Sequence, residues 1–533
     1  MKHGSSVAKL ATTRKSVKLR RAQRSRAHRA TAKLAKEPKI ASGGPNLSKK
    51  LGLRALVATT FFMVSGGPYG LEEIVSGYGF GGALLLLLLV PFIWSLPITM
   101  LVGELTSALP SEGGYYAWAR RALGPFWGVQ TAWMALAMSL FDMAIYPMLV
   151  VTYLGQLFPA LADSSVGGAG WYMALVMIGL SVCWNLRGTR TVGMASQLMA
   201  AALLLPFGVL VVLALSGHGP VSLSASLPSQ LRLPSHEGGS VMPWLNGILL
   251  CLWNYMGWEN ASPVATEVES PQKTYPRAMF LTVLLVAGCY VVPVLCGIAS
   301  GLPVAEWTTG SWVEVGRRLG GPYLAVAIAL GGALCGLGMF NALIGSYARL
   351  PLAMARDGIL PKWLARKDPE TGAPTRSILL AAVLYTACLG LGFKRLVQID
   401  VLLYGAIVVL EFASLIVLRI KEPQLVRPFR IPGGVVVAVL MGCLPVSLLG
   451  LSLWFGRNET GMWGFSAIGL GVLVIASGPL FYLLLRWAKF SRRTQLDPTL
   501  TEARDLRDAR ESREVLPSAS APRSVETPVI LGF

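Results

Sequence analysis

Two long apolar segments of this chain are each interrupted near the middle by residues that a membrane-spanning helix normally avoids. The first runs from Leu51 to about Phe80 and contains the sequence SGGPYG at residues 65–70. The second runs from about Val241 to Val264 and contains NYMGWEN at residues 254–260. In hydrocarbon an unpaired backbone amide or carbonyl costs several kcal/mol, so non-helical backbone lies there only where it lines a cavity or meets a ligand. Two such breaks in corresponding halves of a chain predict a binding site at mid-membrane, of the kind found in transporters with inverted repeats.

The composition places the chain in a membrane. Hydrophobic residues make up 53% of it and charged residues only 14%, with a mean hydropathy of +0.57, whereas soluble domains carry roughly a quarter charged residues. We therefore expect an all-α membrane protein. Stretches of roughly 20 residues with few charges number about twelve: 53–80, 82–109, 125–155, 169–185, 191–216, 242–266, 277–301, 322–348, 376–393, 398–419, 434–456 and 463–486.

The net charge of +20 is concentrated at the amino terminus, where residues 1–50 hold fifteen Lys and Arg against the single acid Glu37. This segment lacks an apolar run, so we expect a disordered arm that lies on anionic membrane lipid. Binding of nucleic acid is the weaker interpretation. The predicted domains are therefore a basic cytoplasmic tail (1–50), a transmembrane permease domain (51–488) and a second disordered cytoplasmic tail (489–533).

The loop charges predict the orientation. With an inside amino terminus, the loops expected in the cytoplasm hold sixteen Lys and Arg and the opposite loops hold six. Positive charge is enriched in cytoplasmic loops, so both termini are expected in the cytoplasm of a cell with the protein in its plasma or inner membrane.

Cysteine and histidine give no sign of a metal or redox site. The seven Cys fall within or at the ends of apolar segments without metal-binding spacing, and all four His lie outside those segments. They are expected to be ordinary core or loop residues. No metal or other cofactor is expected, and no nucleophile and base are placed together as an enzyme would need.

Several motifs together carry a resemblance to a known family. They are VSGGPYGLEE (64–73), PFIWSLP (91–97), ELTSALPSEGGYYAW (104–118), ALGPFWG (122–128), WNYMGWENASPVATEVE (253–269), MARDGILP (354–361), Glu411-Phe412 and RPFRIP (427–432). In these the chain resembles the amino acid/polyamine/organocation superfamily, and within it the polyamine uptake and L-type amino acid branches. The resemblance implies a leucine-transporter fold: a five-plus-five inverted repeat, with helices 1 and 6 broken, followed by two further helices.

The first break suggests an anion site and the second a cation site. Gly66 and Gly67 permit positive φ, and Pro68 suits the first turn of a new half-helix. The amides of residues 65–67 and Gly70 are expected to face the cavity at a helix N-terminus, where a substrate carboxylate would bind. In the second break, the carbonyls of Trp253, Asn254 and Tyr255 are expected to accept hydrogen bonds from an ammonium group.

Acidic residues within the apolar segments indicate a transport pathway. They are Glu72 and Glu73 after the first break, Asp142 in the third segment, Glu259 in the second break and Glu411 in the tenth segment. Ionisable residues are rare in membranes and usually mark pathways. Without a nearby Lys or Arg in sequence, such carboxylates either hold protons or bind a cation. Asp142 and Glu259 are the expected substrate ligands, and Glu72, Glu73, Asp142 and Glu411 are candidates for coupling or gating.

Aromatic residues complete the expected site, because an aromatic face over an ammonium contributes about 0.5–2 kcal/mol. Those beside the breaks or Asp142 are Tyr69, Tyr146, Trp253, Tyr255 and Trp258. The predicted substrate-binding set is thus Ser65, Gly66, Gly67, Tyr69, Gly70, Asp142, Tyr146, Trp253, Asn254, Tyr255, Trp258 and Glu259.

These features favour a permease that takes up a polyamine or cationic amino acid by alternating access, coupled to protons. Sodium is the other coupling ion considered, with Ser346 as a conceivable ligand. A neutral or cationic amino acid antiporter is the alternative within the class, with the first-break amides holding the α-carboxylate. A membrane nutrient sensor that binds without transporting is the alternative from another class.

Overall fold

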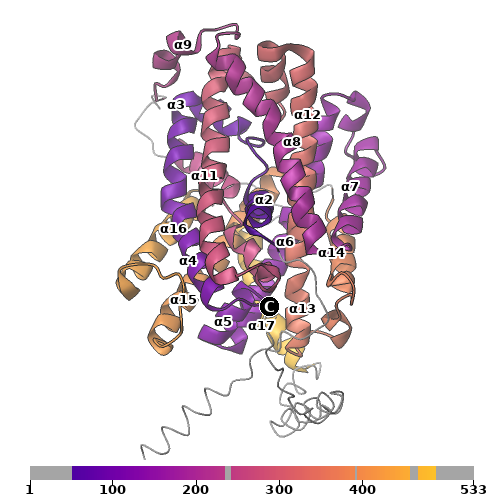
Figure 1. The fold of residues 1–533 in the computed structure, drawn as a ribbon, viewed down its shortest axis with the longest axis vertical. Coiled ribbons are helices and arrows are strands. Elements are labelled where there is room, and N and C mark those ends of the chain that lie inside the picture. The colour runs from indigo at the N-terminus through magenta and orange to yellow at the C-terminus, as the bar shows by residue number, and fades with distance from the viewer. Residues whose placement is uncertain (1–50, 234–241, 390–392, 457–465, 488–533) are drawn as a thin grey trace, which may run out of the picture. The chain divides into compact units, whose positions relative to one another are not determined.

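The computed structural model describes residues 51–233, 242–389, 393–456 and 466–487. Within them all regular secondary structure is helical, apart from one isolated bridge between Leu51 and Val268 (Figure 1). These described residues all belong to one compact unit. The predicted tails at 1–50 and 489–533 lie outside the described residues.

The α-helices vary widely in length. In chain order they are α2 (Leu53–Val64), α3 (Glu72–Val90), α4 (Leu96–Ala108), α5 (Tyr115–Leu123), α6 (Pro125–Gly155), α7 (Ala169–Asn185), α8 (Thr189–Leu215), α9 (Leu223–Gln230), α10 (Met242–Asn254), α11 (Pro271–Gly297), α12 (Trp312–Tyr347), α13 (Arg349–Arg356), α14 (Thr375–Ala387), α15 (Phe393–Lys421), α16 (Gly434–Gly456) and α17 (Ala467–Trp487).

The described residues contain seven helical stretches long and apolar enough to cross a membrane, with four shorter apolar helices beside them. The longest of these stretches, Trp312–Arg356, includes both α12 and the short helix α13 that follows it. An all-helical protein rich in membrane-length helices is therefore confirmed. The count of twelve segments stays a prediction.

The first predicted segment is broken where the sequence predicts it. Helix α2 ends at Val64, and Ser65 takes an extended conformation. The chain becomes helical again at Glu72 and turns at Gly79, whose φ is 65°. The kink at Gly79 divides α3 into two parts with no loop between them. The end of the first predicted segment (53–80) and the start of the second (82–109) therefore lie in one continuous helix.

The second predicted segment is also broken. Helix α10 ends at Asn254, and Gly257 has a left-handed φ of 92°. The chain then forms a 3₁₀ helix, η4 (Trp258–Glu267), rather than a second α-helix. A 3₁₀ helix has three residues per turn, so side chains in η4 face different directions from those of an α-helical continuation.

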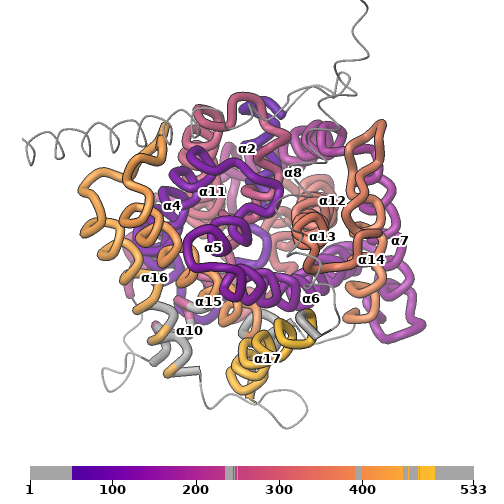
Figure 2. The backbone as a smooth tube through the Cα atoms, turned by 90° about the horizontal axis from the view of Figure 1, so that it is seen from below, coloured from indigo at the N-terminus to yellow at the C-terminus, as the bar shows by residue number. Residues whose placement is uncertain are grey.

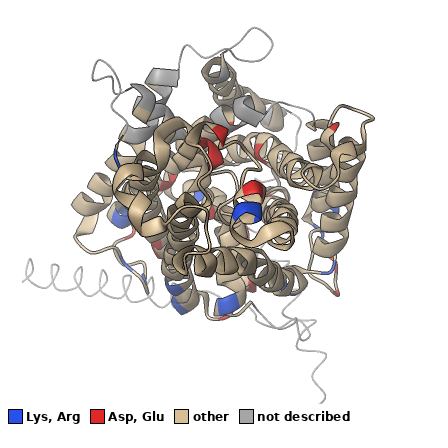
Figure 3. Cartoon of the chain, turned by 90° about the horizontal axis from the view of Figure 1, so that it is seen from above, with Lys and Arg blue, Asp and Glu red and all other residues tan. Residues whose placement is uncertain are grey.

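The bundle is organised around α2 and α12. Helices α11, α8 and α12 pack around α2 (Figure 2), and α12 also packs against α6. Helix α15 packs against α6 and α5. Most of the described ribbon carries no charged residue (Figure 3), and outward-facing apolar side chains such as Leu198 and Val383 are exposed, as expected for surfaces that contact lipid.

A short main-chain link joins the start of α2 to the end of η4. The Leu51 amide donates to the Glu267 carbonyl at 3.0 Å, and the Glu269 amide donates to the Leu51 carbonyl at 2.9 Å. The two broken segments are therefore bonded to each other at one end of the bundle, the end where α5 and α13 lie (Figure 1).

Candidate functional site

The amides of the first break are mostly bonded within the chain. Ser65 donates to the Phe61 carbonyl at 2.6 Å, Gly67 donates to the Ser65 hydroxyl at 3.1 Å, and Gly70 donates to Glu72 Oε2 at 2.8 Å. The expectation that the amides of residues 65–67 and Gly70 are free to bind a substrate carboxylate is therefore wrong for Ser65, Gly67 and Gly70, and for Gly66 it stays a prediction. The Ser65 amide continues the hydrogen bonding of the last turn of α2, and the amides of Gly67 and Gly70 are each satisfied by a side chain two residues away.

Glu72 fixes the end of the first break. Its carboxylate is fully buried and accepts hydrogen bonds from the amides of Gly70 and Gly310, the latter at 3.0 Å, and from the hydroxyl of Tyr153. The neighbouring Glu73 accepts a bond from Thr309 at 3.3 Å. Glu72 thus ties the restart of the helix to α6 and to the residues before α12. A coupling role for Glu72 or Glu73 stays a prediction.

The second break is held by hydroxyl groups from other elements. Tyr290 donates to the Asn254 carbonyl at 2.6 Å, and Trp258 Nε1 donates to the Tyr255 carbonyl at 2.8 Å. The Gly257 amide donates to the Tyr404 hydroxyl at 3.0 Å. A carbonyl oxygen has two lone pairs, so Asn254 and Tyr255 retain acceptor capacity for a ligand.

A small cavity lies between the two breaks. Its volume is about 30 Å³, which holds roughly two water molecules. The predicted residues that line it are Ser65, Gly66, Tyr69, Asp142, Tyr146, Trp253 and Asn254. Gly67, Gly70, Tyr255, Trp258 and Glu259 are not among its lining residues. An organic substrate larger than water therefore requires the elements around this cavity to move apart.

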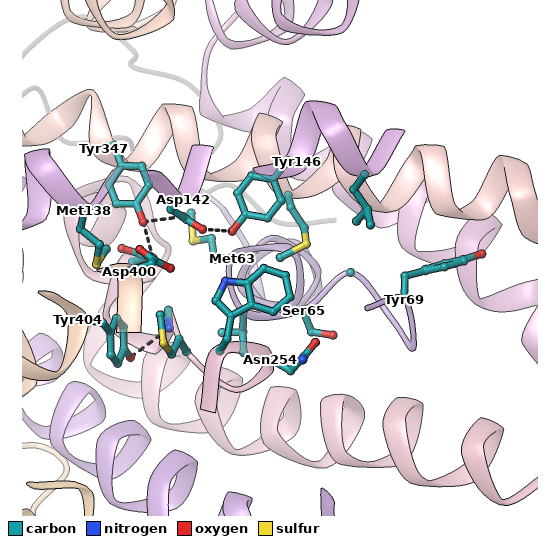
Figure 4. A pocket seen from close by; sticks show the side chains of 18 of the residues that line it. Met63, Ser65, Tyr69, Met138, Asp142, Tyr146, Asn254, Tyr347, Asp400 and Tyr404 are labelled. Atoms are coloured by element: carbon teal, nitrogen blue, oxygen red, sulfur yellow. Dashed lines mark hydrogen bonds between the residues drawn. The ribbon is translucent and has the colours of Figure 1, made fainter. Parts of the chain in front are cut away.

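Asp142 is the central carboxylate of the cavity. Tyr146, one helical turn further along α6, donates to Asp142 Oδ1 at 2.5 Å, and Tyr347 at the end of α12 donates to Oδ2 at 3.0 Å. Figure 4 shows the two hydroxyls around this carboxylate, with Asp400 beside it. The prediction that Asp142 lies at the interior site is consistent with this geometry, because the residue is 6% exposed and faces the cavity.

Asp400 is a second carboxylate in the cavity, and the sequence analysis missed it. It is 1% exposed, and neither carboxylate oxygen has a hydrogen-bond partner in the part of the chain that the structure describes. It lies close enough to Asp142 and Glu259 to interact with both electrostatically. Two carboxylates therefore face one small cavity, and none of its described lining residues is Lys or Arg.

A sequence signal for Asp400 exists. Asp142 and Tyr146 are four residues apart on α6, and Asp400 and Tyr404 are four apart on α15. Residues i and i+4 share a helix face, so each helix presents an acid and a tyrosine to the same cavity. The repeated Asp-x-x-x-Tyr pattern could have identified Asp400 and Tyr404 together.

Glu259 lies behind Tyr404 rather than in the cavity. Tyr404 lines the cavity and donates its hydroxyl hydrogen to Glu259 Oε2 at 2.6 Å. The reason is the 3₁₀ conformation of η4, which turns Glu259 toward α15. Direct contact between Glu259 and a substrate stays a prediction that this geometry does not favour.

The comparisons with known proteins agree on one family. A family model described as amino acid permease matches residues 57–476. A probable polyamine transporter of Arabidopsis thaliana is 37% identical over 412 residues, covering 76% of this chain and 82% of that protein. Polyamine transporter RMV1 of the same plant is 33% identical over 461 residues (86% and 90%). Polyamine transporter PUT1 of Oryza sativa subsp. japonica is 32% identical over 467 residues (86% and 84%).

The chain belongs to the amino acid permease family. The resemblance stated from the motifs is thereby confirmed over most of the membrane domain. Membership identifies the protein as a membrane transporter, and the cavity between the broken segments is its candidate substrate site.

The permease also has a cluster of ion pairs at the end where α5 and α13 lie. Arg349 is buried and donates to both carboxylate oxygens of Glu267, at 3.0 and 2.9 Å. Lys367 lies 3.5 Å from Glu267 and 2.5 Å from Glu112, and Glu112 also pairs with Arg356. This network joins the end of η4 to α13 and the loops around it, beside the MARDGILP motif (354–361).

Proposed function

We propose that this permease is a secondary active transporter that takes up a polyamine through a plasma or inner membrane, coupled to protons, with both termini cytoplasmic. In this proposal twelve membrane helices form a five-plus-five inverted repeat and two further helices. In that arrangement the two breaks, which lie between α2 and α3 and between α10 and η4, belong to the first helix of each repeat. Alternating access opens the central cavity to each side in turn.

The observation that carries the proposal is the pair of carboxylates in the cavity. Asp142 receives two hydroxyl bonds, but Asp400 receives none in the described residues. A buried carboxylate without a partner is strongly disfavoured when charged. An ammonium group of the substrate would provide the missing partner, with Trp253 and tyrosine rings supplying aromatic faces for it.

A polyamine fits this site better than an amino acid does. An α-carboxylate needs free donors at the first break, yet the amides of Ser65, Gly67 and Gly70 already have acceptors. A polyamine carries no carboxylate and needs only acceptors, which Asp400, Asn254 and the carbonyls of the second break provide. The names of the three plant relatives, all polyamine transporters, point the same way. A cationic amino acid is the second candidate substrate.

Asp142 is the proposed proton carrier. Its carboxylate can release a proton and still be stabilised by the hydroxyls of Tyr146 and Tyr347, so both protonation states are accommodated. Asp400, lacking such donors, is the proposed ligand of the ammonium. Because Asp142 and Asp400 have different proposed roles, a substitution at each tests its own role.

The experiment uses the purified full chain in proteoliposomes, with labelled putrescine, spermidine, arginine and leucine. Asp142→Asn should retain exchange between two substrate-filled compartments and lose accumulation driven by a pH gradient, because only net transport requires the proton. Asp400→Asn should weaken both activities for diamines. Asp163→Asn is the matched control, because Asp163 lies in an exposed loop and its carboxylate accepts bonds from the amide and the hydroxyl of Ser165.

The outcomes separate the alternatives. Uphill transport retained by Asp142→Asn would remove this residue from coupling, and equal loss of exchange and accumulation would make it a substrate ligand. Preference for leucine or arginine over both polyamines would favour the amino acid antiporter. Ligand binding without any flux across the sealed vesicle would identify a sensor.

A further inference from the structure

A second group of buried acids lies along α15, beyond the cavity. Asp400, Tyr404 and Glu411 are separated by four and seven residues, so they lie within about 40° of one another on one helix face. The helix rises about 1.5 Å per residue, which places Glu411 about 16 Å from Asp400 along the axis. The direction is toward the end where α5 lies, since Lys421 at the end of α15 donates to a carbonyl of α5.

Glu411 is fully buried and unpartnered. Its exposed fraction is 0%, and both carboxylate oxygens lack a hydrogen-bond partner in the described part of the chain. The hydroxyl of Tyr115, at the start of α5, is also buried and unpartnered there. Each unsatisfied buried polar group costs about 1–3 kcal/mol. Two such groups in one place require a ligand or a function to explain them.

The groups around Glu411 come from three elements. Helix α15, which carries Glu411, packs against α5, which carries Tyr115, and α5 also contacts η4. Tyr404 of α15 donates to Glu259 of η4 at 2.6 Å. The ion pair of Arg419 with Glu104 lies two turns further along α15. Glu104 accepts two bonds from Arg419 and one from the Ile431 amide, and it also pairs with Arg427 at 3.3 Å, so both arginines are engaged with Glu104. No cation of the described residues therefore neutralises Glu411.

Tyr404 connects this group to the cavity. Tyr404 lines the cavity, and its hydroxyl donates to Glu259 at 2.6 Å and accepts from the Gly257 amide at 3.0 Å. A hydroxyl that donates on one side and can accept on the other can pass a proton without net change. It gives its own hydrogen to Glu259 while taking one from the cavity, so that one O–H bond breaks and one forms.

We propose that Tyr404, Glu259 and Glu411 form a proton route that runs from the substrate cavity along α15 to the end of the molecule where α5 lies. This inference rests on the proton-coupled transport proposed above. A proton received at Glu259 passes to the Glu411 carboxylate, so that Glu259 returns to its charged form as Glu411 becomes neutral. Glu411 then releases the proton toward Tyr115 and the aqueous side. The substrate does not follow this route.

The test measures proton flux and substrate flux in the same vesicles. Wild-type protein in proteoliposomes with an internal pH-sensitive dye is given a putrescine gradient, and protons moved per putrescine are recorded. Glu411→Gln should bind putrescine with an affinity within twofold of wild type by calorimetry and retain exchange. Its proton flux per substrate should fall at least tenfold, because an amide cannot carry the proton.

Two further variants make the result decisive. Glu422→Gln is the matched control, because Glu422 follows α15 and pairs with Arg121 at the surface; its proton-to-substrate ratio should equal that of wild type. Glu411→Asp keeps a titratable group and should restore part of the flux. If Glu411→Gln does not fold, Tyr404→Phe, which keeps the aromatic ring and removes the hydroxyl that bonds Glu259 and Gly257, is measured in its place.

Each result has one meaning. A wild-type proton-to-substrate ratio in Glu411→Gln, or in Tyr404→Phe where that variant is used, overturns the route while leaving proton coupling intact. Putrescine transport by the wild-type protein without any proton flux instead overturns the coupling in the proposed function, and the route with it.

Discussion

Gly257, in the second break, lies close to main-chain atoms at the end of the helix before the first break. A Cβ placed there would lie 2.3 Å from the main-chain oxygen of Met63, in the last turn of α2. Main chain cannot rotate away as a flexible side chain can. The φ of Gly257 is also +92°, a conformation that costs an L-residue about 1–2 kcal/mol.

Gly257→Ala should therefore lower the free energy of unfolding by about 2–5 kcal/mol, with about 1–2 kcal/mol from the backbone conformation and about 1–3 kcal/mol from overpacking against α2. It should also weaken putrescine binding, because Gly257 lines the cavity and its amide positions Tyr404. Denaturant unfolding in detergent micelles and calorimetry measure the two effects.

Gly79→Ala separates the two contributions. Gly79 has a φ of +65°, but no atom lies within 4 Å of a Cβ placed there. This control should lose only the conformational part, about 1–2 kcal/mol, and should bind putrescine as wild type does. Equal losses of stability for the two variants would refute the close contact between the breaks.

Two further predictions concern ion pairs. Glu104→Ala leaves Arg419 buried without its carboxylate partner, so the free energy of unfolding should fall by about 3–5 kcal/mol. The double variant Glu104→Leu/Arg419→Met should recover most of this loss. A double variant as unstable as Glu104→Ala would contradict this explanation. Glu267→Gln weakens the ion pair with Arg349. It should therefore speed thiol labelling of a cysteine introduced at Thr59, because Thr59 and Arg349 line the same small cavity. Labelling no faster than with Glu267 intact would show that this ion pair does not restrain the opening of that cavity.

Sequence predicted the breaks because their cause is local. Glycine, proline and polar residues in an apolar run interrupt a helix whatever surrounds them, and both interruptions occur where expected. Asp142 was predictable for a similar reason, since a lone acid in the middle of a long apolar helix has few places to lie except a protein interior.

The partners of those residues were not predictable, because they depend on how distant elements pack. Glu72 satisfies the Gly70 amide and the Gly310 amide together, which requires α12 to approach the first break. Glu259 faces Tyr404 because the segment after Gly257 is a 3₁₀ helix, and a change of helical phase cannot be read from composition. Asp400 was overlooked because it lies near the start of its apolar segment, where acids are common.

The main-chain link between Leu51 and the end of η4 bears on how the protein is made. Residues 52–266 separate the partners in the chain, and at about 5–20 residues per second their synthesis takes on the order of 10–40 s. Throughout that interval the amide and carbonyl of Leu51 must be satisfied by water or headgroups. The first broken segment thus enters the membrane before its permanent hydrogen-bond partners exist. A nascent chain arrested just before Glu267 would carry six of the twelve predicted segments and would lack Asp400 and Tyr404 of the cavity.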